Sequence, residues 1–393
     1  MTTSAKKILL FIVSSVVCLT LLEGSLRALG FSYPAFFQPD PQVGTIHRPG
    51  AEGWYRSEGE AYVRINAVGF RDVHWSLEKP QSTFRIAVLG DSFTDALQVD
   101  LAATYSKQLE KLLGSCRSLH GSKVEVLNFG VSGFGTMQQL LTFRHFALKY
   151  NPDLVLVAFF SGNDVRNNSK KLDPDKLRPF PILKDGAIEA DMSFTQLPRF
   201  QELSGSIHRA WRYLSFLRTI QAISYLKNNI FVFRNGLVDH RKPADGEIGL
   251  NDAIFLRSDS DEWTEAWLLT EAILRQLMKE VESAGGRMFL ATLSVGIQVN
   301  PDANARDEYA KRLGVKDLTY PDARLQRFAE QIKLPHIILA PLLLQIAEHD
   351  KAYLHGFSNT GMGIGHWNEK GHAWAARLIA SAICEQSADG WAH

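Results

Sequence analysis

Cysteine is scarce in this sequence, and the spacing of the few cysteines excludes the common metal and redox motifs. The chain has 393 residues, of which only Cys18, Cys116 and Cys384 are cysteines. It contains no CxxC pair and no cysteine and histidine cluster with the spacing of a zinc site. Cys18 lies in an apolar N-terminal stretch. The other two can stay as free thiols or form a disulfide in an oxidising compartment.

An excess of charge of either sign is also absent. The 43 basic and 42 acidic residues leave a formal net charge of +1, and no basic run suggests a groove that follows phosphates. We therefore expect no nucleic acid partner. A hydrophobic share of 45% with 22% charged residues is typical of a folded chain. Internal repeats and low-complexity tracts are missing as well.

The N-terminus carries an uncharged apolar run that is short for a membrane span. The run covers residues 8–22, follows two lysines, and falls below the ~20 residues of a typical transmembrane helix. A signal peptide cleaved near residues 28–30 is one interpretation. We favour the other, in which the helix continues through Glu23 and Arg27 and residues 1–30 are an uncleaved signal anchor. The lysines predict a cytoplasmic N-terminus. The chain is then a single-pass protein of the cell membrane, with the inner membrane as a partner and its main domain periplasmic or extracellular.

The rest of the chain alternates strand-like and helix-like patterns. Within residues 31–80, the stretch at 53–72 alternates apolar and polar side chains and is broken by glycines, which predicts a small accessory β segment. Apolar runs then predict strands at 84–90, 123–130, 153–160, 287–294 and 336–340. Helical spacing predicts helices at 104–115, 136–151, 262–286, 303–313, 322–332 and 368–386. The stretch at about 165–260 loses this pattern, and we interpret it as an insertion with a helix near 207–226.

Strands that alternate with helices predict an α/β fold with helices on both faces of a parallel sheet. We expect a three-layer α/β/α sandwich at 81–388, built on a five-stranded, mainly parallel, flavodoxin-like sheet. The N-terminal membrane helix and the small β segment precede it. Sheets of this kind bind ligands at the carboxyl ends of their strands.

Chemistry-bearing residues follow several of the predicted strands. The first strand ends in GDSF at 90–93, the second in NFGVSGFG at 128–135, and the third in SGNDV at 161–165. The sequence GHWNEKGH, at 365–372, immediately precedes and enters the last helix. These stretches supply a hydroxyl, glycine N–H groups, a carboxamide and an imidazole. Together they are the groups needed for acyl transfer through a covalent intermediate.

These four stretches, taken in order, resemble the sequence blocks of the SGNH or GDSL hydrolase superfamily, over about residues 84–384. The anchor, the INAVGFRD sequence before the first block and the HWNEKGH ending are similar to a bacterial, membrane-anchored branch linked to cell-envelope and exopolysaccharide chemistry. The resemblance implies that Ser92 is the nucleophile and His366 the general base. It also implies an oxyanion hole made by the N–H groups of Ser92 and Gly133 and the side-chain amide of Asn163.

The sequence departs from the superfamily at one position. Members usually carry an aspartate three residues before the histidine, and here that residue is Gly363. This predicts a Ser–His dyad oriented by a backbone carbonyl, or an acid from elsewhere in the chain. Glu369 is close in sequence but begins the closing helix, which makes it a poor candidate.

The resemblance implies a serine esterase or acyltransferase that needs no metal or organic cofactor. Its expected substrates are acyl esters, above all O-acetyl esters, of a cell-envelope or secreted polysaccharide. Two alternatives stay open. The first is a non-catalytic carbohydrate-binding protein of the same fold, which the missing aspartate permits. The second is a lipase or thioesterase that acts on acyl chains, which a long apolar groove would favour.

Overall fold

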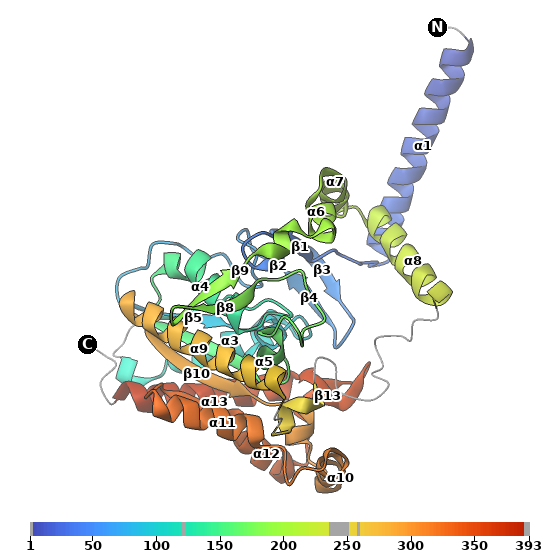
Figure 1. Cartoon of the computed structure of the whole chain (residues 1–393). Helices are drawn as coiled ribbons and strands as arrows, with labels where there is room; N and C mark the ends of the chain where they lie inside the picture. Colours follow the sequence, from blue (N-terminus) through green and yellow to red (C-terminus); the bar gives the residue numbers. More distant parts are fainter. Residues whose placement is uncertain (1–2, 120–122, 236–250, 258–259, 389–393) are drawn as a thin grey trace.

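A parallel sheet forms the centre of the protein (Figure 1). The computed structural model describes residues 3–119, 123–235, 251–257 and 260–388. Five strands pair in the order β11-β10-β7-β5-β6, and every pair is parallel. They are β5 (Thr83–Leu89), β6 (Lys123–Asn128), β7 (Leu154–Phe160), β10 (Arg287–Leu293) and β11 (His336–Ile338). The predicted α/β fold with a five-stranded, flavodoxin-like sheet is confirmed.

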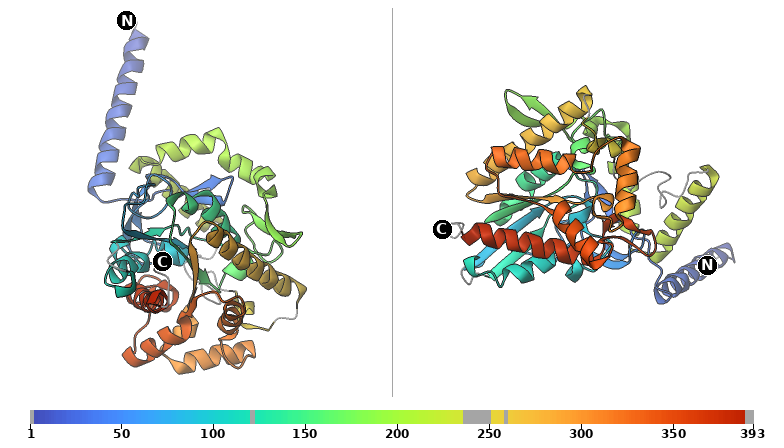
Figure 2. Two further views of the ribbon diagram at one scale, coloured as in Figure 1. Left: turned by 90° about the vertical axis from the view of Figure 1, so that its left-hand side faces the viewer. Right: turned by 90° about the horizontal axis from the view of Figure 1, so that it is seen from below.

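Helices cover both faces of this sheet, which completes the three layers (Figure 2). One face packs against α3 (Tyr105–Leu113) and α13 (Glu369–Ala388), which contact each other. The opposite face packs against α4 (Thr136–His145), α9 (Asp261–Ser283) and α11 (Tyr320–Gln331). All seven residues of the central strand β7 are buried, as its continuous apolar run predicted.

Short elements surround the sandwich. The expected small β segment is present as two antiparallel hairpins, and two further hairpins lie in the insertion and before α13. Their strands are β1 (Phe37–Asp40), β2 (Gly44–His47), β3 (Glu52–Tyr55), β4 (Ala61–Arg64), β8 (Phe180–Lys184), β9 (Ala187–Asp191), β12 (His355–Phe357) and β13 (Gly361–Trp367). The remaining helices near the sheet are α2 (Ser92–Asp95), α5 (Asp164–Asn167), α10 (Ala303–Leu313) and α12 (Leu339–Asp350).

Two sequence predictions need correction. The strand expected at 336–340 ends at Ile338, and α12, which was not predicted, begins at the next residue. The single helix expected near 207–226 is two helices, α7 (Ser206–Leu214) and α8 (Arg218–Asn235), preceded by α6 (Pro198–Ser204). The buried Ser215 lies at the break. The parts of the insertion at 236–250 and 258–259 lie outside the described residues.

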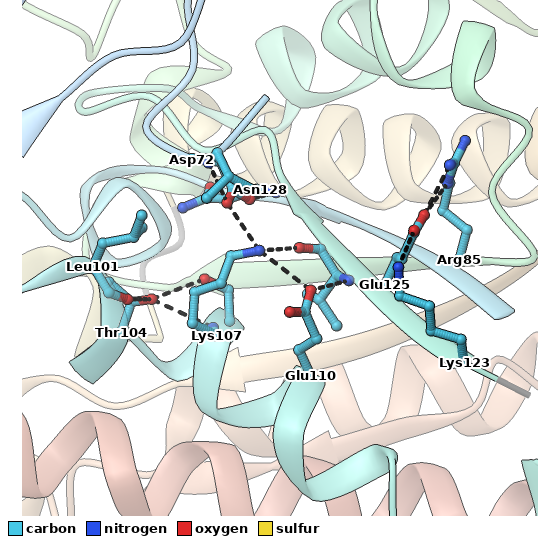
Figure 3. Close-up of polar contacts among 12 residues, drawn as sticks. Asp72, Arg85, Leu101, Thr104, Lys107, Glu110, Lys123, Glu125 and Asn128 are labelled. Atoms are coloured by element: carbon cyan, nitrogen blue, oxygen red, sulfur yellow. Dashed lines mark hydrogen bonds and ion pairs between the residues drawn. The ribbon is translucent and has the colours of Figure 1, made fainter. Parts of the chain in front are cut away.

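The accessory segment is joined to the sheet by a buried cation (Figure 3). The Lys107 ammonium, on α3, lies 2.8 Å from an Asp72 carboxylate oxygen and donates to the Val126 carbonyl on β6, also at 2.8 Å. The other Asp72 oxygen accepts the backbone N–H of Asn128 at 3.0 Å. Burial raises the pKa of Asp72 to about 6, against the opposing effect of Lys107. This network fixes the end of the accessory segment beside the carboxyl end of β6.

Most of the N-terminal helix α1 (Thr3–Ala28) stands away from the domain, and only its last turns contact it (Figure 1). None of its residues is buried, and its length and mean hydropathy of 2.2 suffice to cross a membrane. The helix therefore continues past the apolar run at 8–22, through Glu23 and Arg27, as the anchor interpretation requires. A signal sequence passes the same test of length and composition.

A disulfide joins Cys116, after α3, to Cys384 on α13. The bond resolves the alternative that the sequence left open, and together with the apolar N-terminal helix it indicates a domain outside the cytoplasm.

Removing this disulfide should destabilise the domain, because it closes a loop of 268 residues in the unfolded chain. We expect the pair Cys116→Ala and Cys384→Ala to cost about 2–4 kcal/mol, which lowers Tm by about 5 °C or more. Thermal denaturation followed by circular dichroism measures this. The exposed Cys18 provides the control, since Cys18→Ala should leave Tm unchanged. Equal Tm values for the double variant and the parent would contradict the prediction.

Candidate active site

The predicted nucleophile and the predicted base lie in hydrogen-bonding contact. Ser92 is the first residue of α2, directly after β5, and His366 lies on β13. The distance between Ser92 Oγ and His366 Nε2 is 2.7 Å, although 274 residues separate them in the chain. The Asp91 side chain accepts the N–H of Phe93 and so caps α2, which presents Ser92 at the sheet edge.

An acid that the sequence did not reveal completes this arrangement. The Glu58 carboxylate, between β3 and β4, is hydrogen-bonded to His366 Nδ1. Its Oε1 also accepts the backbone N–H of His366 at 2.8 Å. The expectation of a dyad oriented by a backbone carbonyl is therefore wrong, and the accessory segment supplies the acid. Glu369 is exposed at the start of α13.

Glycine before the histidine makes room for this acid. Gly365 has a φ of +79°, and a Cβ there would lie 2.2 Å from Glu58 Oε1. Gly363 has a φ of +84°, and a Cβ there would lie 2.9 Å from the Tyr353 ring. Gly363, which replaces the expected aspartate, thus belongs to a glycine-rich strand, β13. The missing side chain at Gly365 leaves room on this strand for the Glu58 carboxylate.

Glu58 is held as a buried carboxylate. It is 5% exposed, and burial by itself raises its pKa. The charge of His366 and its two hydrogen bonds outweigh burial, so the net pKa of Glu58 is lowered and the group stays ionised at neutral pH. The next residue, Gly59, donates its N–H to Asn359 Oδ1 at 2.9 Å and accepts from Asn359 Nδ2 at 3.0 Å. This pair of bonds fixes the Glu58 loop to the turn of the β12–β13 hairpin.

The three predicted oxyanion donors line the same pocket as Ser92 and His366, a cavity of about 260 Å³. Within the described residues, no carbonyl accepts the backbone N–H of Ser92 or of Gly133. Gly133 has a φ of +83°. Asn163 Nδ2 donates one hydrogen to Asp91 at 3.3 Å, which leaves its second hydrogen for a ligand.

Residues from the accessory segment also support the loops that carry these donors. His47, fully buried, lies 3.1 Å from Asp95, whose Oδ2 accepts from the Ser132 hydroxyl at 2.6 Å. Ser132 directly precedes Gly133. Arg71 donates to the carbonyls of Asp95 and its neighbour Ala96, so it holds the turn that ends α2. The segment therefore braces both sides of the pocket.

One aromatic ring packs on the imidazole of His366, and two further rings lie buried nearby in the sequence. The Phe93 ring lies 4.9 Å from it, centroid to centroid. Trp367 is fully buried and donates to Ser294, so it packs in the core and is not available to stack on a sugar. His355 is buried as well, and its Nδ1 is 2.7 Å from the carbonyl of Gly365. Burial lowers the pKa of His355 to about 4, so it acts as a neutral support for the Gly365 turn.

Charged side chains form part of the pocket wall. Arg178 pairs with Asp173 at 3.2 Å and with Asp175 at 3.4 Å. Arg166 lines the same pocket, and burial followed by the charge of Arg178 lowers its pKa. The pocket wall therefore combines these charged groups with the apolar side chains of Phe93, Phe160 and Pro174. The described residues hold no group of His, Cys, Asp and Glu side chains that suits a metal ion.

Comparison with known proteins gives distant structural resemblances. No protein-family model and no curated protein matches the chain. The acetyl xylan esterase AlAXEase is 12% identical with a TM-score of 0.38, covering 76% of this chain and 100% of its own. A catalytic mutant of Axe2, an acetylxylan esterase from Geobacillus stearothermophilus, is 14% identical with a TM-score of 0.36, covering 79% of this chain and 96% of its own. TesA is 11% identical with a TM-score of 0.38, covering 76% of this chain and 97% of its own. At such low similarity, the function of this chain must be argued from its own residues.

Proposed function

We propose that this protein is a serine esterase or acyltransferase that works through an acyl-enzyme. The observation that carries the proposal is the continuous chain of hydrogen bonds from Ser92 through His366 to Glu58. A hydroxyl, an imidazole and a buried carboxylate in that order are the parts of a nucleophilic triad. A purely structural histidine would not need a serine on one nitrogen and a carboxylate on the other beside an open cavity.

In the proposed reaction, Ser92 Oγ attacks the ester carbonyl carbon while His366 Nε2 takes its proton. The carbonyl oxygen becomes an oxyanion, which the N–H groups of Ser92 and Gly133 and the Asn163 amide stabilise. His366 then gives the proton to the departing alcohol, and the acyl group stays on Ser92. Water or a sugar hydroxyl attacks next, so hydrolysis and transfer share this intermediate. Glu58 keeps the hydrogen of His366 on Nδ1 throughout. None of these steps needs a cofactor.

We propose that the substrate is a short acyl ester, most simply an O-acetyl group, on a cell-envelope or secreted polysaccharide. The pocket is small, about 260 Å³, and polar and charged side chains line it together with Phe93, Phe160 and Pro174. A long acyl chain needs an apolar groove, whereas an acetyl group on a sugar needs little depth and many hydrogen-bonding partners. The anchor α1 and the disulfide support a site outside the cytoplasm, where such polysaccharides lie.

Chain-length dependence tests this function. We expect kcat/KM for p-nitrophenyl acetate to exceed that for p-nitrophenyl decanoate by about 10-fold or more, because a cavity of about 260 Å³ has little room for the added methylenes. Hydrolysis rates measured with both esters, with the Ser92→Ala variant as the background, give the ratio. Faster hydrolysis of the decanoate would favour the lipase or thioesterase alternative. Absence of hydrolysis with either ester would favour the non-catalytic carbohydrate-binding protein.

A further inference from the structure

Helix α7 exposes its apolar face, which is the reverse of what a helix on a water-soluble domain does. Ile207, Trp211 and Leu214 follow the spacing i, i+4 and i+7 and so form one stripe. They are 82%, 43% and 45% exposed, and no residue of α7 is buried. Packing against the protein therefore does not explain why this stripe is apolar.

The exposed apolar surface continues beyond α7. Tyr213 at its end and Phe216 in the turn before α8 are exposed too. We call these side chains the apolar platform: Ile207, Trp211, Tyr213, Leu214 and Phe216. The exposed Arg209 lies two residues after Ile207, on the face of α7 opposite the stripe. Aromatic and aliphatic side chains on one face with a basic residue on the other are the composition of helices that lie in the membrane interface.

The platform is tied to the end of α1. Both oxygens of the Glu23 carboxylate accept backbone N–H groups at the start of α8, from Arg218 and Thr219, each at 2.9 Å. Arg27 donates to the carbonyl of Phe216, a platform residue, at 3.3 Å. The apolar run of α1 ends at Leu22. These contacts therefore lie at the level where an anchored α1 leaves the membrane. Figure 1 shows α7 on the same side of the domain as α1.

The platform is also connected to the rest of the protein. Arg48, in the accessory segment, donates to the carbonyl of Arg212 and to the hydroxyl of Ser215. The accessory segment in turn carries Glu58. The same segment thus links the candidate site to the helices beside α1.

We propose that the apolar platform of α7 rests in the headgroup region of the bilayer that α1 crosses, as a second membrane contact of this chain. The proposal rests on α1 acting as an anchor and is independent of the reaction at Ser92. Two contacts, one spanning and one interfacial, hold the domain in a fixed orientation, whereas α1 alone would leave it free to tilt. A protein partner is a less suitable occupant, because the platform adjoins the membrane end of α1.

Lipid quenching at single labels tests this contact in the full chain. The protein with Cys18→Ser is reconstituted in nanodiscs of phosphatidylethanolamine and phosphatidylglycerol, with its disulfide intact. An environment-sensitive fluorophore is attached at Trp211→Cys, and in a matched control at Leu268→Cys. Leu268 is an exposed apolar residue on α9. Headgroup-level doxyl lipids should quench the label at 211 at least about threefold more than the label at 268.

Equal quenching at the two positions would overturn the proposal. A label at 211 that is shielded from water yet unquenched by lipid would also overturn it, because another protein surface would then cover the platform. As a further check, Ile207→Glu with Leu214→Glu should abolish the excess quenching at 211. Both residues are exposed, so these substitutions should leave the fold and the hydrolysis of p-nitrophenyl acetate unchanged.

Discussion

Replacing Ser92 by alanine is expected to reduce kcat/KM for p-nitrophenyl acetate by about 10⁴-fold or more. The substitution removes the oxygen that lies 2.7 Å from His366 Nε2 and leaves no other group to carry the acyl chain. Serine and alanine differ only by that oxygen, and Ser92 begins a helix whose cap is the Asp91 side chain. We therefore expect the fold and Tm to stay close to those of the parent.

Steady-state kinetics on the purified chain measure this loss, with circular dichroism as the check on folding. Ser76→Ala is the matched control, because Ser76 is an exposed serine outside the pocket. Its activity should equal that of the parent. If Ser92→Ala keeps more than about one-tenth of the parental rate, Ser92 is not the nucleophile, and the reaction must use another group.

The second large effect is expected at Glu58. Glu58→Gln should lower kcat by about 10³- to 10⁴-fold. Because Oε1 already accepts the backbone N–H of His366, the new amide oxygen should keep that bond and turn the NH₂ toward Nδ1. The amide then donates to Nδ1 and favours the imidazole tautomer with its hydrogen on Nε2. That tautomer cannot take the proton of Ser92.

The control for this variant lies two residues away. Glu60 is exposed and pairs with Arg56 at 3.0 Å, so Glu60→Gln changes the charge of the same loop without touching His366. It should leave kcat within about twofold of the parent, as surface pairs contribute little. If both glutamine variants lose activity equally, the loop acts through general charge and Glu58 does not orient His366.

The pH dependence of the rate separates a positioning role of Glu58 from simple damage to the fold. The pKa of Glu58 is lowered, so this carboxylate stays ionised at any pH above the ordinary pKa of a glutamate. Protonation of Glu58 therefore contributes no loss of rate near neutral pH. The parental rate should fall on acidification as His366 binds a proton. In Glu58→Gln this decline should move to lower pH, because the neutral amide no longer favours the imidazolium. A damaged fold would lower the rate without moving the profile.

The fold could be predicted because it depends on local patterns, and four candidate site residues could be named because their sequence blocks resemble those of a known superfamily. Apolar runs that alternate with stretches of helical spacing predict a parallel sheet, and the carboxyl ends of its strands meet at one edge. Ser92, Gly133 and Asn163 directly follow strands, which is why the sequence indicated that they converge. His366 was indicated by its block before the last helix. The break between α7 and α8 was missed because apolar residues continue through it at helical spacing.

Glu58 could not be predicted, because nothing local marks it. It lies in a loop between two short strands, 308 residues before His366, and its neighbours are ordinary turn residues. Only the packing of the accessory segment onto the sheet, through Lys107 and Arg71, brings it to the imidazole. The sequence carried only an indirect signal, the glycine at position 365 next to the histidine. A Cβ on Gly365 would lie 2.2 Å from Glu58 Oε1, so any other residue there would exclude this carboxylate.

The most direct test of the account is covalent labelling by a fluorophosphonate, followed by peptide mass spectrometry on the parent and on Glu58→Gln. The account predicts a single adduct on the peptide that contains Ser92. It also predicts a labelling rate reduced at least about 100-fold in Glu58→Gln and unchanged in Glu60→Gln. An adduct on another residue, no adduct on the folded parent, or equal labelling rates in the parent and Glu58→Gln would contradict it.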